Sequence, residues 1–114
     1  MREDEVTGQI DELVGCAIVL DASCDEQNGA LVNATASRVR ELSTALYAVF
    51  DDGPRVWRPA MAGAWLAMSS ATHAEEEAGA GEVNGDLLGA WVSFACSGVR
   101  QLAQSWNGVV GGQT

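Results

Sequence analysis

The chain has 114 residues and a mass of 11.9 kDa, which is the size of one domain, so we treat residues 1–114 as a single domain. Its apolar fraction of 47% and charged fraction of 19% are those of ordinary globular domains. The formal net charge of −10 argues against direct binding of nucleic acid, because such binding depends on Lys and Arg that neutralise phosphates.

The sequence has no feature of an exported or membrane protein, and we expect a cytoplasmic location without membrane contact. Residues 1–5 are acidic where an export signal needs basic side chains before an apolar stretch. Residues 87–103 are weakly charged, but they include one Arg and are at the short limit for a membrane span. Three cysteines, Cys16, Cys24 and Cys96, cannot all pair within one chain, so we interpret them as small, reduced core residues. Arg without Lys, together with abundant Ala and Gly, indicates GC-rich coding, as in an actinobacterium or its phage.

The first two predicted helices span residues 4–22 and 28–51. In the first, apolar side chains recur three or four residues apart, and Asp11 and Glu12 lie on the opposite, solvent side. Its apolar residues are Val6, Ile10, Leu13, Val14, Ala17, Ile18 and Leu20. The second carries a heptad row, which predicts packing against other helices along its whole length. This row consists of Val32, Thr35, Val39, Leu42, Leu46 and Val49.

The third predicted helix spans residues 59–77 and has Pro59 in its first turn, where a missing N–H costs nothing. Its large side chains form one row, made of Met61, Trp65, Met68 and Thr72. Beside that row lie small residues that would let another helix approach unusually closely, namely Ala60, Gly63, Ala64, Ala67 and Ala71. Residues 59–74 contain no Asp, Glu, Lys or Arg, so this helix lacks a charged outer face.

The fourth predicted helix spans residues 85–107 and follows Asn84, a favourable N-capping residue. It is apolar on nearly every face, and residues 87–114 contain no acid and one base, Arg100. Helices of this kind are buried, either in the core or between subunits. We expect a dimer interface that contains Leu87, Trp91, Phe94 and Trp106. The alternative for Trp91 and Trp106, and for Trp65 of the third helix, is a place in the core.

These four segments predict an all-α protein, a four-helix bundle built of two helical hairpins, which forms a dimer. A faint repeat, in which residues 28–32 resemble residues 84–88, favours the pairing of helices into hairpins. Each copy of the repeat begins with Asn-Gly, a sequence that forms turns.

His73 is the best candidate for metal binding, because Glu76 and Glu77 follow it at three and four residues, on one helical face. Di-iron bundles, however, place Glu before His and repeat that motif on a second helix, whereas the order here is reversed. The single His would also have to serve any nucleophile, and nothing in the sequence positions it to do so. We therefore predict no metal, no cofactor and no enzymatic activity, with the glutamates forming a solvated helix end.

Trp57 lies between Arg55 and Arg58 in the central, proline-containing break. Trp and Arg are enriched at interaction hot spots, which favours a partner-binding patch. The alternative is that Trp57 covers the end of the hydrophobic core while the two arginines pair with Asp51 and Asp52. The sequence leaves both interpretations open.

Acidic side chains are dense in residues 3–26, and charge is scarce in residues 59–74 and 87–114. This contrast favours a non-enzymatic protein that binds another protein, as an inhibitor, an antitoxin-like neutraliser or a phage anti-defence factor does. The target would present a basic surface, such as a nucleic-acid-binding channel. The expected partner-binding residues are Arg55, Trp57, Arg58, Asp11 and Glu12. A homo-oligomeric scaffold subunit is the second hypothesis, and a metal-binding helical protein that uses His73, Glu76 and Glu77 is the third.

Overall fold

The computed structural model describes residues 2–112, which form four long helices and one short 3-10 turn. The helices are α1 (Glu3–Asp25), α2 (Gly29–Asp52), α3 (Pro59–Ala78) and α4 (Gly85–Gly111), and the turn η1 spans Arg55–Trp57. The prediction of an all-helical protein with four packed helices is confirmed for these residues. The main differences are three additional residues at the end of α1, four at the end of α4, and the unexpected η1.

The starts of three helices follow from local chemistry. The side-chain oxygen of Asn28 accepts a hydrogen bond from the Leu31 N–H at 3.2 Å, and Asn84 does the same for the Leu87 N–H at 3.1 Å. Each asparagine thus satisfies a backbone donor that has no partner within its helix. Pro59 occupies the first turn of α3, as predicted.

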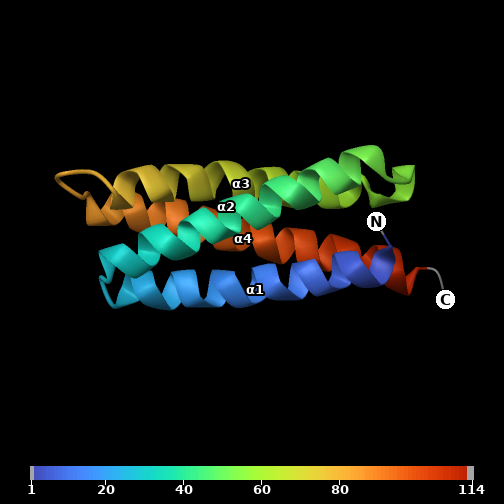
Figure 1. The fold of residues 1–114 in the computed structure, drawn as a ribbon, viewed down its shortest axis with the longest axis horizontal. Coiled ribbons are helices and arrows are strands. Elements are labelled where there is room, and N and C mark those ends of the chain that lie inside the picture. Colours follow the sequence, from blue (N-terminus) through green and yellow to red (C-terminus); the bar gives the residue numbers. More distant parts are fainter. Residues whose placement is uncertain (1, 113–114) are drawn as a thin grey trace.

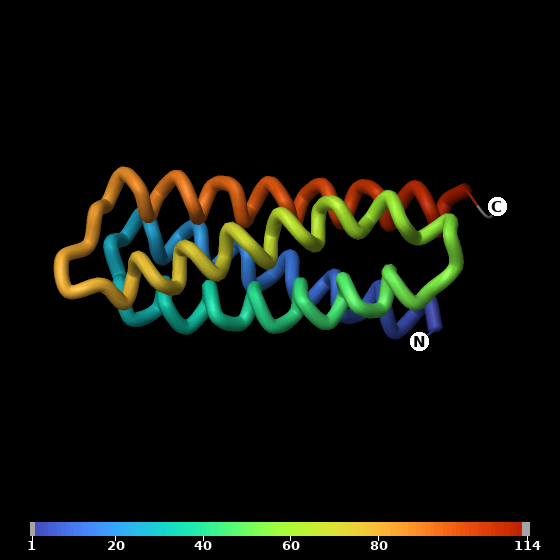
Figure 2. Tube along the Cα trace, turned by 90° about the horizontal axis from the view of Figure 1, so that it is seen from above, coloured from blue at the N-terminus to red at the C-terminus, as the bar shows by residue number. Residues whose placement is uncertain are grey.

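The four helices lie side by side in a rod of 48 × 21 × 19 Å (Figure 1). Each helix contacts two neighbours extensively: α1 packs on α2 and α4, and α3 packs on α2 and α4. These contacts run around the bundle and do not by themselves divide it into two hairpins. The start of α1 and the end of α4 lie at the same end of the rod (Figure 2).

The core is lined by one narrow stripe from each of α1 and α2. In α1 the buried apolar residues follow alternating steps of four and three, which is the spacing of a coiled-coil seam. They are Val6, Ile10, Leu13, Ala17 and Leu20. The expectation that Ile18 shares this face is wrong, since its side chain is 66% exposed. Val14 is half-buried at the edge of the stripe. In α2 the predicted row is buried at Val32, Val39, Leu42 and Leu46, and it is widened by Ala36, Ser43 and Phe50.

Small side chains form the core face of α3. The buried residues are Ala60, Gly63, Ala64, Ala67, Ser70, Ala71 and Ala74. Because this small-residue face is the one that packs, the interpretation of Trp65 as a core residue is wrong, and its indole is 55% exposed. The close approach expected from these small residues occurs between α3 and α4.

Gly63 and Gly98 lie where α3 and α4 approach most closely. A Cβ atom built on Gly98 would be 2.5 Å from the backbone nitrogen of Ala67, and one built on Gly63 would be 2.7 Å from the carbonyl oxygen of Gly98. Both distances are far shorter than a van der Waals contact, and the atoms concerned are backbone atoms. Each helix therefore needs glycine where it meets the other.

Three aromatic rings fill one end of the bundle. The ring centroid of Trp106 lies 5.8 Å from that of Phe50 and 5.2 Å from that of Trp57. The indole N–H of Trp106 donates a hydrogen bond to the hydroxyl of Thr7 at 2.9 Å. Since buried indole N–H groups need an acceptor, this bond lets a large ring from α4 occupy the core beside α1.

Two ion pairs connect neighbouring helices. The Arg40 guanidinium of α2 lies 2.8 Å from the Glu75 carboxylate of α3, and Arg38 of α2 lies 2.6 Å from Glu12 of α1. Asn33 of α2 adds a hydrogen bond to the carbonyl oxygen of Glu75 at 3.1 Å. The Arg38–Glu12 pair is exposed and the Arg40–Glu75 pair is half-buried. Pairs that remain accessible to water contribute little to stability, so their main effect is to orient the helices.

Replacement of either contact glycine should destabilise the protein. We expect Gly63→Ala and Gly98→Ala each to lower the free energy of unfolding by about 1–3 kcal/mol, because the added methyl group must push two backbones apart. Gly108→Ala on α4 is the matched control, since a Cβ there meets nothing within 4 Å. It should instead raise stability by roughly 0.5–1 kcal/mol, through helix propensity. Urea unfolding followed by circular dichroism measures all three, and equal effects at the three sites would contradict the close packing.

Candidate protein-binding surfaces

The outer side of α3 and α4 is free of acids except where Glu75, Glu76 and Glu77 end α3 and Asp86 begins α4. Residues 59–74 carry no ionisable acid or base other than His73, and from Leu87 to the end of α4 the only such group is Arg100, apart from Cys96. Several large apolar side chains on these two helices are nevertheless exposed. They are Trp65 on α3 and Leu87 and Phe94 on α4, and we call these outward surfaces of the two helices the apolar face. Val110 is also exposed, but it continues the row of α4 that faces α1. Exposed apolar side chains without surrounding charge are typical of a surface that another molecule covers.

An aromatic cluster lies at the junction of α3 and α4 on this face. The imidazole of His73 stacks on the indole of Trp91, with ring centroids 4.3 Å apart and planes inclined by 21°. Phe94 meets Trp91 edge to face at 6.1 Å. Trp91 is half-buried, whereas Phe94 is 51% exposed and Leu87, one turn before Trp91, is also exposed. Two of the four predicted interface residues are thus open to solvent, and a third is partly so.

Trp106 is different, and its assignment to a subunit interface is corrected by the structure. Only 1% of its surface is exposed, because Phe50, Trp57 and Thr7 enclose it within one chain. The sequence placed it on the same apolar rows as Trp91. The two differ because Trp106 faces the bundle interior at the end where the turn after α2 covers it.

The predicted patch around Trp57 is also corrected. Trp57 is 7% exposed and packs against Trp106, so it covers the end of the core, as one of the two interpretations held. Arg55 and Arg58 are exposed beside it. Neither arginine forms an ion pair with Asp51 or Asp52 in the described residues 2–112. The two guanidinium groups remain available to a partner, but the indole between them does not.

The opposite side of the bundle is acidic. The acidic residues of α1 and α2 are Glu3, Asp4, Glu5, Asp11, Glu12, Asp21, Asp25, Glu41, Asp51 and Asp52. Of the two predicted partner-binding acids, Glu12 is engaged by Arg38, while Asp11 is exposed. Ten acids thus lie on α1 and α2, which we call the acidic layer, whereas those of α3 and α4 are confined to Glu75, Glu76 and Glu77 at the end of α3 and Asp86 at the start of α4.

The three candidate metal ligands are not brought together. His73 Nδ1 lies 3.7 Å from Glu76 Oε2, but the Glu77 carboxylate accepts a hydrogen bond from the backbone N–H of Asn84 at 2.7 Å. Within residues 2–112 no group of three His, Cys, Asp or Glu side chains is placed to hold a metal ion. Glu77 instead fastens the loop between α3 and α4.

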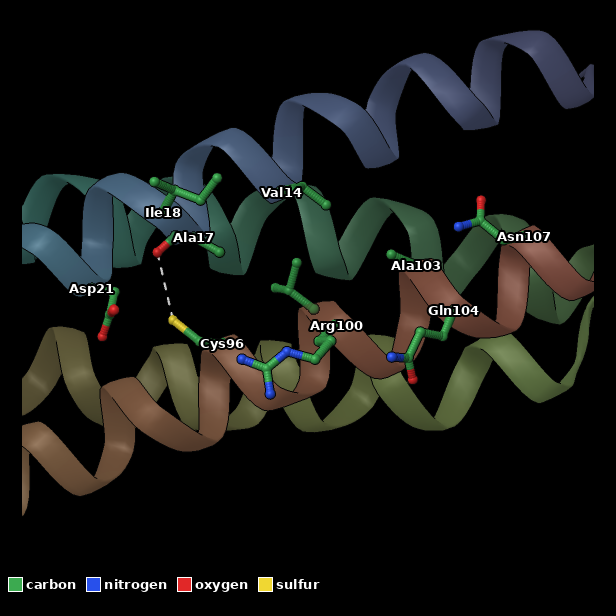
Figure 3. A pocket seen from close by; sticks show the side chains of 10 residues that line it. Val14, Ala17, Ile18, Asp21, Cys96, Arg100, Ala103, Gln104 and Asn107 are labelled. Atoms are coloured by element: carbon green, nitrogen blue, oxygen red, sulfur yellow. Dashed lines mark hydrogen bonds between the residues drawn. The ribbon is translucent and has the colours of Figure 1, made fainter.

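A groove that sequence reasoning missed runs between α1 and α4. Its cavity is about 280 Å³ and has an apolar floor, with Asp21 on the α1 side and Arg100 on the α4 side (Figure 3). Ile18 borders it as an exposed apolar side chain. The signal in the sequence was a second row on α1 outside the core stripe, in which Val14 and Ile18 stand between Asp11 and Asp21.

The cysteines lie at the edges of the core and not within it. All three are half-buried and none forms a disulfide. The Cys96 thiol contacts the carbonyl oxygen of Ala17 at 3.5 Å, beside the groove. Burial, reinforced by the negative charge of Asp21, raises the pKa of Cys96 to about 11. Burial also raises the pKa of Cys16 and of Cys24.

No helix in residues 2–112 has the length and apolar character needed to cross a membrane. The chain matches no known protein family, and neither a curated protein nor a solved structure shows significant similarity to it.

Cys96 should react slowly with alkylating reagents. A pKa of about 11 in place of the ordinary 9.0 leaves roughly a hundredfold less thiolate at pH 8, and the thiolate is the reactive form. We expect the iodoacetamide reaction at Cys96, followed by peptide mass spectrometry, to accelerate with pH up to about 11. In urea its rate should match those of Cys16 and Cys24. Labelling of Cys96 at pH 8 as fast in the folded protein as in urea would contradict this burial.

Proposed function

We propose that the chain is a non-enzymatic, cytoplasmic protein-binding module that forms a dimer through its apolar face and binds a basic partner protein through its acidic layer. In this proposal α1 with α2 is an acidic hairpin and α3 with α4 is an apolar one. The observation that carries the proposal is this segregation of charge across a single small bundle.

Electrostatics favours the apolar face as the dimer contact. Two molecules of net charge −10 repel each other, and the repulsion is strongest where acidic residues are dense. The outer sides of α3 and α4 carry fewer acids than those of α1 and α2, and these acids, Glu75, Glu76, Glu77 and Asp86, lie at one end of the bundle, so two copies could meet there with less repulsion. Aromatic side chains such as Trp91 and Phe94 are typical of interface hot spots, because their burial removes a large apolar area from water.

The acidic layer favours a basic partner. Negative side chains on one side of a protein accelerate association with a positive surface and disfavour other partners. An inhibitor, an antitoxin-like neutraliser or a phage anti-defence factor would use such a layer against a target with a basic nucleic-acid channel. The exposed aromatic cluster also supports a second candidate, a scaffold subunit whose assembly through the apolar face is itself the function.

Dimerisation can be tested by replacing two exposed side chains of the apolar face, Leu87 and Phe94. We expect sedimentation velocity at micromolar concentrations to show a dimer for the natural chain and a monomer of 11.9 kDa for the double variant Leu87→Ser, Phe94→Ser. Since both side chains are exposed, the helix content should not change. Leu31→Ser, an exposed leucine on α2, is the matched control and should remain dimeric. A natural chain that sediments as a monomer would refute the dimer.

Partner binding can be tested by its dependence on salt. Proteins captured from a host lysate on the immobilised chain should be released as salt rises toward 1 M, where the screening length falls to about 3 Å. Replacement of Asp11, Asp21 and Asp25 together by asparagine should reduce capture even at low salt. Capture that resists salt and these substitutions, but is lost with Leu87→Ser and Phe94→Ser, would instead support the scaffold candidate.

A further inference from the structure

The groove between α1 and α4 is bordered by two rows of side chains that have the spacing of a helix-packing seam. On α1, steps of four and three residues give Thr7, Asp11, Val14, Ile18, Asp21 and Asp25. On α4, the same spacing gives Cys96, Arg100, Ala103 and Asn107. Thr7 accepts the hydrogen bond from Trp106, and Val14, Ile18 and Asp21 line the groove, so the α1 row is turned toward α4.

The floor of the groove is apolar and only partly covered. Ala17 and Val99 are buried at its base, while Val14 and Ala103 are half-buried on its two sides. Ile18 is 66% exposed, which is a larger exposed fraction than that of any other large apolar side chain in the described residues. Figure 3 shows Val14 and Ile18 on the α1 side of the groove, with Arg100 and Gln104 on α4. A side chain inserted between them would gain apolar contact with both helices.

The two edges of the groove differ in charge: the α1 edge is acidic and the α4 edge carries one base. Asp11, Asp21 and Asp25 lie in the α1 row, and all three are exposed. Arg100 is the one base in the α4 row. None of these four side chains takes part in an ion pair within residues 2–112. The groove therefore offers an acidic edge along α1 and a single positive group opposite it, all unneutralised by the fold.

We propose that this groove binds an amphipathic, basic helix of the partner protein. The apolar stripe of that helix would lie against Ile18 and Val14, and its Lys or Arg residues would pair with the aspartates of α1. This is the common mode in which an apolar helix face enters a groove between two helices. The proposal rests on the proposed function, because it assigns the basic partner to a particular site in the acidic protein.

The spacing of the charges specifies the partner further. Along a helix, Asp11 and Asp21 are separated by about 15 Å, and Asp21 and Asp25 by about 6 Å. A helix lying along α1 would therefore carry basic residues about ten and four positions apart. An acidic or amide side chain would face Arg100. A second copy of this chain does not fit, since none of its helices carries basic residues four or ten positions apart.

The test uses a fluorescent peptide of about 20 residues, long enough for a helix of about 30 Å. Its leucines follow the heptad spacing and its flanking positions carry lysine; a second peptide has glutamate in place of lysine. Fluorescence anisotropy at low salt should show binding of the lysine peptide and none of the glutamate peptide. The natural 114-residue chain is compared with its Ile18→Lys and Val19→Lys variants.

Val19 provides the matched control, because it adjoins Ile18 and is 43% exposed but does not line the groove. Both variants change the net charge equally, and neither removes a buried side chain. We expect Ile18→Lys to weaken binding of the lysine peptide by about tenfold or more, and Val19→Lys by less than about twofold. Asp21→Asn should weaken it by an intermediate factor. The Leu87→Ser, Phe94→Ser variant should bind the peptide normally, since those residues lie outside the groove.

Two results would overturn the proposal. Equal weakening by Ile18→Lys and Val19→Lys would mean that the peptide responds to overall charge and not to the groove, while the acidic layer would still bind a basic partner. No binding of the lysine peptide by the natural chain at low salt would refute the groove as a helix site, whereas the basic partner itself is tested separately by the salt dependence of capture. Dimerisation, measured separately by sedimentation, is unaffected by either result.

Discussion

The close contact between α3 and α4 at Gly63 and Gly98 is the constraint on which the arrangement of the bundle depends. Because backbone atoms of each helix occupy the space where the other would carry a Cβ, the two helices meet along their smallest side chains. The larger side chains of α3 are then turned away from this contact. Because α3 packs on α4 through its small residues, the indole of Trp65 is exposed. For the same reason, Trp91 stacks on His73 at the edge of the α3–α4 contact.

The sequence was sufficient to predict the helices and the buried rows of α2 and α3, but not which tryptophan side chains are enclosed. Asn28, Pro59 and Asn84 mark three helix starts through capping chemistry that acts over a few residues, so they could be recognised locally. Trp65, Trp91 and Trp106 all lie in apolar rows, and which of them is enclosed depends on the neighbouring helices. Trp106 is enclosed because Phe50, Trp57 and Thr7 surround it, and these come from three other parts of the chain.

The candidate surfaces were predictable to a similar, partial extent. The scarcity of charge in α3 and α4 is a property of composition, and the exposure of Leu87 and Phe94 agrees with it. The groove was not predicted, because Ile18 and Val14 resemble core residues when only helical spacing is considered. A row with two apolar residues between aspartates, next to a core stripe, can be recognised in a sequence, but whether it borders a groove depends on the distance between α1 and α4.

The hydrogen bond between Thr7 and Trp106 has a consequence for how the chain folds as it is synthesised. It joins the first turns of α1 to the last turns of α4. The ribosome synthesises these two segments early and late, about 100 residues apart. Until α4 has emerged, the inner faces of α1 and α3 lack one of their two neighbouring helices. The indole of Trp106, which packs against Phe50 and Trp57, is also missing. The bundle is therefore completed only after most of the chain is free, and its earlier, three-helix state is the one most in need of protection from aggregation.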